Sequence, residues 1–256
     1  MRKKWFLLGC LCIFGPVLFQ GWKQKQQEQV VTTFHKELKS VDEIQIERVL
    51  QEAREYNLKL FQTGVLDKRN YKKQLNLLGT GIMASLEIPR IGVKLPIYHG
   101  TEEGVLKEGA GHMQETSLPI GGENTHCVLA GHSGMSSAKM FTRLDELQKG
   151  DVFLISVCNQ TLCYQVCEIR TVRPDNEDVI KIQEGKDRIS LITCTPYGLN
   201  THRLVVTGER ITKEEVQEEK VQEEKVLVQR VSKRERIWLG GVILVAVIGV
   251  YRRLRK

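Results

Sequence analysis

The sequence lacks the signatures of the common cofactor and metal sites. It contains no glycine-rich phosphate loop, no cluster of metal-ligating side chains and no cofactor motif. Cys158, Cys163 and Cys167 are spaced by five and four residues, which does not match the paired Cys-x-x-Cys pattern of a zinc site. They are typical of small buried residues, although a disulfide among them stays open if the domain is extracellular. We therefore expect no cofactor and no metal.

A basic core is also missing, although the formal net charge is +7. Ten cations face a single anion, Glu235, in the flanks of the two apolar ends, and these flanks carry +9, which leaves about −2 for the rest. Because the excess belongs to the ends and not to a groove, we exclude nucleic acid as a partner. The ten cations are Arg2, Lys3, Lys4, Lys233, Arg234, Arg236, Arg252, Arg253, Arg255 and Lys256.

Two apolar segments predict attachment to a lipid bilayer. Residues 1–22 contain Trp5–Trp22, which is 18 residues without a formal charge and has tryptophan at both ends. A cleaved signal peptide would look similar, but no small-x-small site follows, which favours a retained signal-anchor. Residues 237–256 contain the shorter run Ile237–Tyr251 and a basic end. The expected protein crosses the cell membrane twice, with both termini cytoplasmic and the region between them extracytoplasmic.

Two polar regions connect these spans to a central domain. Residues 23–78 have apolar side chains every three or four positions and predict helices, and Ser40 with Glu43 is typical of a capping pair. A helical hairpin packed on the central domain, or spacing it from the membrane, is the simplest interpretation. Residues 212–236 repeat Val-Gln-Glu-Glu-Lys from Val216 and from Val221, which is typical of a charged spacer.

Short β-rich runs separated by turn residues fill residues 79–211. They predict a mostly β fold, a sandwich or a closed barrel of seven to eight strands with short helices. One helix is expected at Ser136–Leu147, and loops are expected at Leu77–Thr80 and Leu118–Thr125. The expected strands are Met83–Ile88, Val93–Tyr98, Cys127–Ala130, Val152–Val157, Leu162–Val172, Ile189–Cys194 and Leu204–Ile211.

The last two of these strands bring a thiol and a guanidinium together. The polar segment Thr195–Arg203, with its proline and glycine, joins them as a loop. If the strands pair, Cys194 and Arg203 lie side by side at its mouth. A cation beside a thiol favours the nucleophilic thiolate, and a guanidinium can donate to an oxygen that gains charge during acyl transfer.

His132 is the expected general acid and base. It lies where a strand leads into the expected helix, a loop-edge position suited to chemistry. His202 is a poorer candidate for this role, because it is adjacent to Arg203 and on a strand would point to the opposite face. No aspartate or glutamate stands out as a third member of the site. The competing histidines of the same region are His99, His112, His126 and His202.

Four motifs occur in an order that is similar to that of a known family. Thr193–Gly198 (Thr-Cys-Thr-Pro-Tyr-Gly), followed by Asn200-Thr201-His202-Arg203, resembles the active-site segment of sortases of the pilus-assembling class C group. Ala130–Gly134 resembles their catalytic-histidine segment. Leu86–Pro89 with Leu95–Thr101 resembles the opening strands of the sortase barrel, and Phe141–Asp145 with Lys149–Asp151 resembles the helix and turn that follow the histidine. The resemblance covers roughly residues 82–211.

The resemblance implies a closed sortase-type β-barrel and a cysteine transpeptidase with His132, Cys194 and Arg203 as catalytic residues. Such an enzyme cleaves an LPXTG-like sorting signal through a thioester on Cys194. It then transfers the pilin to a lysine amine of an acceptor pilin and so polymerises pili on a Gram-positive cell. Three alternatives remain: a cell-wall-anchoring sortase of another class, a cysteine peptidase that uses water, and a non-catalytic, membrane-tethered pilin-binding module.

The resemblance also implies a regulatory lid, but its usual motif is missing. Class C sortases typically carry an Asp-Pro-aromatic motif that plugs the cysteine. Here Asp67 is followed by Lys68 and Arg69. We therefore expect that the cysteine is not plugged in this way, and whether residues 60–80 cover Cys194 stays open.

Overall fold

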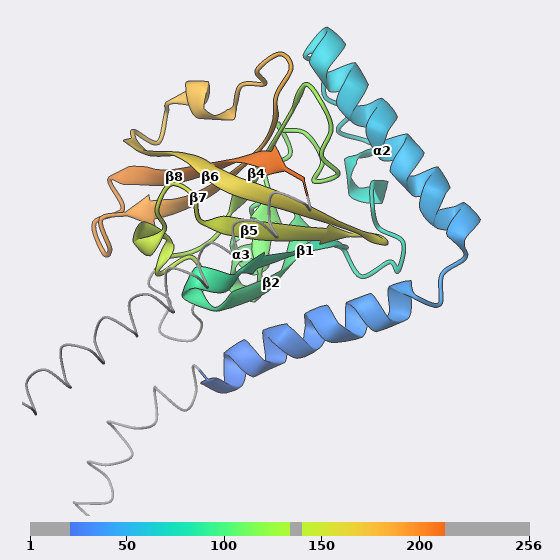
Figure 1. Ribbon diagram of the computed structural model, residues 1–256, viewed down its shortest axis with the longest axis horizontal. Helices are drawn as coiled ribbons and strands as arrows, with labels where there is room; N and C mark the ends of the chain where they lie inside the picture. The colour runs from blue at the N-terminus through green and yellow to red at the C-terminus, as the bar shows by residue number, and fades with distance from the viewer. Residues whose placement is uncertain (1–20, 134–139, 213–256) are drawn as a thin grey trace, which may run out of the picture. The chain divides into compact units, whose positions relative to one another are not determined.

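The predicted β-barrel is confirmed. The computed structural model describes residues 21–133 and 140–212, and eight strands in this part of the chain close into a barrel in the order β1-β2-β3-β4-β7-β8-β6-β5 (Figure 1). The strands are β1 (Ile82–Ile88), β2 (Val93–His99), β3 (Ala110–His112), β4 (Thr125–Ala130), β5 (Val152–Val157), β6 (Gln160–Val172), β7 (Asp187–Thr195) and β8 (His202–Ile211).

Strand β7 occupies the position that matters for function. It pairs in parallel with β4 and antiparallel with β8. The carboxyl ends of β4 and β7 therefore meet the amino end of β8 at one edge of the barrel. The parallel β4–β7 pair is joined by a long excursion through β5 and β6, so sequence proximity alone could not reveal it.

The barrel interior is filled by large apolar and aromatic side chains. Phe153 and Tyr164 stack with ring centroids 5.7 Å apart. Gly208 allows this pair to approach the wall, because a Cβ at that position would lie 2.5 Å from the Phe153 ring. The loop expected at Leu118–Thr125 is present up to Asn124, where it gives way to β4.

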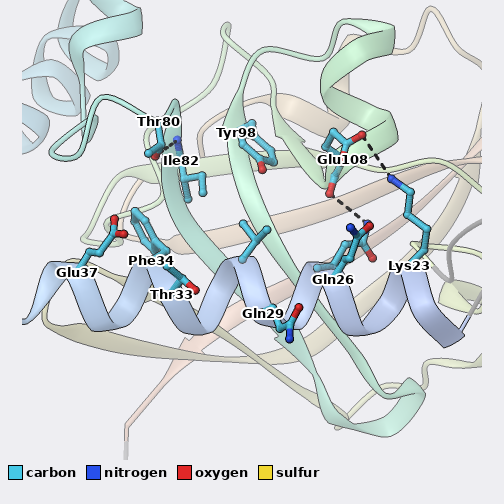
Figure 2. A pocket seen from close by; sticks show the side chains of 12 residues that line it. Lys23, Gln26, Gln29, Thr33, Phe34, Glu37, Thr80, Ile82, Tyr98 and Glu108 are labelled. Atoms are coloured by element: carbon cyan, nitrogen blue, oxygen red, sulfur yellow. Dashed lines mark hydrogen bonds and ion pairs between the residues drawn. The ribbon is translucent and has the colours of Figure 1, made fainter.

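Two helices precede the barrel and contact it separately. The first covers residues 21–38, and His35 Nε2 lies 2.8 Å from Ser85 Oγ of β1. A groove of about 430 Å³ lies between this helix and the first two strands, lined in part by Phe34, Ile82 and Tyr98 (Figure 2). These packing contacts favour the interpretation of residues 23–78 as helices that dock on the central domain.

The second helix, α2 (Glu43–Thr63), is tied to the barrel by a buried amide. Asn57 Nδ2 donates to the carbonyl of Leu118 at 3.2 Å, and the Leu118 amide donates back to Asn57 Oδ1 at 2.7 Å. The expected capping pair of Ser40 and Glu43 is wrong. Asp42 caps α2 by accepting from the Ile44 amide, because Ser40 is two residues too early and donates to the carbonyl of Glu37 instead.

The prediction of a helix at Ser136–Leu147 is wrong for residues 140–147, which is the part that the structure describes. Residues 134–139 lie outside the described residues. From Met140 the chain forms turns and then a short 3-10 helix, η3 (Leu144–Glu146). Met140 has φ 36°, which ends any regular α-helix. Met140, Phe141, Leu144 and Leu147 are nevertheless all buried. The apolar spacing therefore predicted correctly that these side chains are buried, but the backbone that buries them consists of turns and a short 3-10 helix.

Two short elements were not predicted. Strand β3 has only three residues and pairs in parallel with β2 and antiparallel with β4. Helix α3 (Glu103–Glu108) precedes it. Within residues 21–133 and 140–212, no helix is long and apolar enough to cross a bilayer. Residues 1–20 of the span predicted at residues 1–22, and the whole span predicted at residues 237–256, lie outside the described residues.

Candidate active site

Cys194 and Arg203 are direct neighbours, as the sequence predicts. They are cross-strand partners in the register of β7 and β8. Directly opposite residues of an antiparallel pair present their side chains on the same face, with Cβ atoms roughly 5 Å apart. His202 pairs with Thr195 and therefore belongs to the other face. Cys194 is partly exposed, whereas Cys127, Cys158 and Cys163 are buried, and all four are free thiols.

The segment that carries His132 is fastened to the strand that carries Cys194. The Gly131 amide donates to the carbonyl of Ile192 at 3.0 Å, and the hydroxyl of Thr193 donates to the carbonyl of Gly131 at 2.7 Å. One residue past the histidine, the hydroxyl of Ser133 donates to the Cys194 carbonyl at 2.7 Å. Three hydrogen bonds thus hold the His132 backbone beside the nucleophile, and Thr193 and Ser133 are contributors that sequence reasoning missed.

Close packing behind the histidine fixes the direction in which its segment leaves β4. A Cβ at Gly131 would lie only 2.7 Å from the Phe141 ring. The Phe141 amide donates to the His132 carbonyl at 3.0 Å. Glycine at this position therefore lets a buried aromatic ring touch the backbone immediately before His132.

Arg203 is held by its own loop. Its Nη1 donates to the carbonyls of Asn200 and His202 at 3.2 and 3.1 Å. A guanidinium has five N–H donors, so these bonds orient the group and leave donors for a substrate oxygen. Tyr197 and Leu199 of the same loop are strongly exposed, which makes this side of the edge the more open one.

His132 has an acidic neighbour that sequence reasoning missed. Its Nε2 lies 3.3 Å from Oε2 of Glu103, and Lys107 Nζ lies 3.2 Å from the other oxygen, Oε1. The hydrogen bond from Lys107 and the nearby His132 lower the pKa of Glu103. No acidic residue stands out in the sequence as a third member of the site, but the structure places Glu103 beside His132. No signal in the sequence marked Glu103, because it lies on the short, unpredicted helix α3.

The competing histidines of the barrel are occupied elsewhere. His112 is fully buried, with Nε2 2.8 Å from the Ser117 carbonyl and Nδ1 2.9 Å from the Tyr71 hydroxyl, and burial lowers its pKa to about 4. His126 lies between the carbonyl of Lys181 and the hydroxyl of Ser190, and burial lowers its pKa as well.

His99 also has a structural position. Its two ring nitrogens face the carbonyls of Gly81 and Gln74, at 3.1 and 2.7 Å. It therefore joins the end of β2 to the segment that leads from α2 into β1. His99, His112 and His126 thus have structural partners elsewhere in the barrel, and His202, although it lies next to Arg203, belongs to the opposite face of the strand.

Residues 60–80, where the resemblance implies a lid, are anchored by a buried tyrosine. Tyr71, in the 3-10 helix η1 (Tyr71–Lys73), is almost fully buried, and its hydroxyl accepts from the Gly100 amide at 2.9 Å. Within the described ranges, no hydrogen bond or ion pair joins residues 60–80 to Cys194. Across residues 21–133 and 140–212, no group of three or more histidine, cysteine, aspartate or glutamate side chains could hold a metal ion.

Comparison with known proteins shows which family of proteins this chain is similar to. A family model described as the sortase domain matches residues 86–211. Sortase C1 from Streptococcus agalactiae is 42% identical, with a TM-score of 0.69, and the match covers 72% of this chain and 99% of that one. Sortase C from Clostridium perfringens, solved with the C-terminal cell wall sorting motif, is 38% identical with a TM-score of 0.67, covering 72% and 98% of the two chains.

A curated relative matches over a shorter range. Sortase D of Bacillus subtilis is 33% identical over 130 residues, which is 50% of this chain and 63% of that protein, so the match spans less than two thirds of that relative. The closed barrel and its edge define a β-barrel protein with a cysteine-centred site. The chain belongs to the sortase family. Its neighbours among solved structures are sortases of class C.

Proposed function

We propose that this protein is a membrane-anchored transpeptidase that joins pilin subunits. Its substrate is an LPXTG-like sorting signal at the end of a pilin, and its acceptor is a lysine amine of another pilin. The observation that carries the proposal is the pairing of Cys194 with Arg203, together with the hydrogen bond from Ser133 to the Cys194 carbonyl. Family membership and the class C neighbours supply the substrate class.

The first half of the reaction is an acyl transfer to sulfur. The Cys194 thiolate attacks the carbonyl carbon of the signal's threonine, and a carbon–sulfur bond forms. Arg203 donates to the oxygen that gains charge. Protonated His132 gives its proton to the nitrogen of the following glycine, the carbon–nitrogen bond breaks, and the C-terminal piece leaves as an amine.

The second half reverses these roles. The lysine amine attacks the thioester carbonyl and gives a proton to neutral His132. The carbon–sulfur bond then breaks and returns the thiolate, while an isopeptide bond joins the two pilins. Two predicted membrane spans, at residues 1–22 and 237–256, would hold the barrel at the outer face of the membrane, where such substrates emerge.

The test is the variant Cys194→Ala in a pilus-forming host. We expect the high-molecular-weight pilin ladder to disappear while the protein still accumulates in the membrane. The buried cysteine variant Cys163→Ala is the control and should keep the ladder, since this thiol lies away from the barrel edge. A normal ladder from Cys194→Ala would remove the proposal.

The acceptor is tested separately with the purified full-length protein in detergent. Given a sorting-signal peptide with either a pilin lysine peptide or a cell-wall amine, the proposal predicts isopeptide product with the lysine peptide. Product formed only with the cell-wall amine would indicate an anchoring sortase instead. Hydrolysis alone would indicate a peptidase.

A further inference from the structure

Glu103 meets His132 through one defined nitrogen of the imidazole. The contact joins Oε2 of Glu103 to Nε2 of His132 at 3.3 Å. In the part of the chain that the structure describes, no hydrogen bond reaches Nδ1. The two nitrogens of the ring are therefore in different environments, and a mechanism that moves a proton through this ring has to use one of them.

The helix that carries Glu103 is held in place by close packing and by the first helix. A Cβ at Gly111 of β3 would lie 2.9 Å from the Leu106 side chain, so α3 rests directly on that strand. At the other end of α3, Lys23 forms an ion pair with Glu108 at 3.6 Å, and Figure 2 shows the two side chains pointing at each other.

A buried glutamine, Gln27, links helix α3, which carries Glu103, to the segment that packs against His132. The amide nitrogen of Gln27 donates to the carbonyl of Glu108 at 3.1 Å and also lies 3.5 Å from the sulfur of Met140. Met140 immediately precedes Phe141, whose amide bonds the His132 carbonyl. Gln27 is 5% exposed, so this link is shielded from water. Glu103 and His132 are thus positioned by the same neighbour.

The chemistry of the carboxylate and the imidazole determines which ring nitrogen of His132 carries the hydrogen. An ionised carboxylate only accepts hydrogen bonds, so Nε2 has to carry the hydrogen when it faces Glu103. In neutral imidazole the lone pair is then on Nδ1. The atom that receives the proton of the incoming amine, and returns it to the leaving one, is consequently Nδ1.

We propose that Glu103 is a positioning residue that holds His132 by Nε2 and assigns Nδ1 to proton transfer. This role rests on the proposed function, but its structural half does not: the tautomer can be measured without any turnover. Lys107 moderates the role, because it shares the carboxylate through Oε1 at 3.2 Å. Removing Lys107 should strengthen the hold of Glu103 on the imidazole.

The test uses the full-length protein in detergent micelles with ¹⁵N-labelled histidine. The ¹⁵N shifts of His132, identified by their loss in His132→Gln, report which nitrogen carries the hydrogen. We expect the Nε2–H form in the wild type and a mixture of both tautomers in Glu103→Ala. Lys107→Met should keep the Nε2–H form at least as dominant as in the wild type, because it removes the cation that shares the Glu103 carboxylate.

The kinetic readout separates positioning from folding. For Glu103→Ala we expect kcat to fall about two- to fivefold with an unchanged KM, since an exposed ion pair contributes at most about 1 kcal/mol. Glu102→Gln is the matched control: it removes a carboxylate one residue earlier and should behave as wild type. Glu103→Asp should recover part of the loss.

Two outcomes would overturn the proposal. One is an unchanged tautomer in Glu103→Ala; the other is an equal loss of activity in Glu103→Ala and Glu102→Gln. Failure of the proposed function looks different. In that case the wild type makes no transpeptidation product, while the nitrogen shifts still respond to Glu103 and Lys107.

Discussion

Replacing Gly131 by alanine should damage catalysis more than stability. The added Cβ would lie 2.7 Å from the Phe141 ring, whereas ordinary contacts begin at about 3.4 Å. Either the ring or the backbone before His132 has to move by roughly 0.7–1.3 Å. Because Phe141 is 1% exposed and surrounded by the core, the histidine segment is the part that can yield. A misplacement near 1 Å can cost on the order of 100-fold in rate.

The structure gives a magnitude for each readout. Overpacking of this kind costs about 1–3 kcal/mol of unfolding free energy. We expect kcat/KM for a sorting-signal peptide to fall about 10- to 100-fold, with the loss in kcat. The double variant Gly131→Ala/Phe141→Leu makes room for the Cβ and should recover part of the activity, although Phe141→Leu alone lowers stability. The non-clashing control is Gly104→Ala, whose Cβ has nothing within 4 Å.

The assay is peptide cleavage by the full-length protein in detergent, with urea unfolding of the same samples. Wild-type kcat/KM in Gly131→Ala would show that His132 is not positioned by this contact. A loss of activity that matches the loss of folded protein would contradict the argument equally.

Three further predictions concern other contacts. Asn57→Ala should lower the free energy of unfolding by about 1–3 kcal/mol in urea titration, because it leaves the buried amide of Leu118 unpaired, while the Leu118 carbonyl still accepts from the Ile120 amide; a change no larger than that of exposed Glu55→Ala would refute this. His112 has a pKa of about 4 in the fold, below its usual 6.5. The lowered pKa therefore contributes to the free energy of unfolding fully above pH 6.5, and this contribution, on the order of 3 kcal/mol, is lost as the pH falls toward 4. His112→Gln should flatten that slope in urea titrations, and an unchanged slope would contradict it. Arg203→Lys should reduce kcat/KM about 100-fold because lysine lacks the planar fork, and near-normal rates would exclude an oxyanion role.

The sequence predicted the barrel edge well, for a physical reason. The runs on either side of Thr195–Arg203 are rich in β-branched residues, and a short polar loop forces consecutive strands to pair antiparallel. Cys194 and Arg203 close the same hairpin, so their proximity followed from local pattern alone. The pairing of β7 with β4 is non-local, and the place of His132 beside Cys194 came from family resemblance.

What the sequence missed depends on contacts far along the chain. Strand β3 has three residues and no alternation to detect. Glu103 lies on a six-residue helix, and its meeting with His132 needs the parallel β2–β3 pair that brings α3 to the edge. The apolar spacing after Ser136 suggested a helix because a periodic pattern reports burial and not the backbone that achieves it.

In the proposed reaction, Cys194 takes up the acyl group at this edge of the barrel. The most direct measurement is the intact mass of the full-length protein after incubation with an LPXTG-containing peptide, followed by digestion to locate the added mass. We expect a thioester adduct on Cys194 that a lysine peptide removes, and none in Cys194→Ala. An adduct on another cysteine, or peptide cleavage that persists in Cys194→Ala, would contradict it.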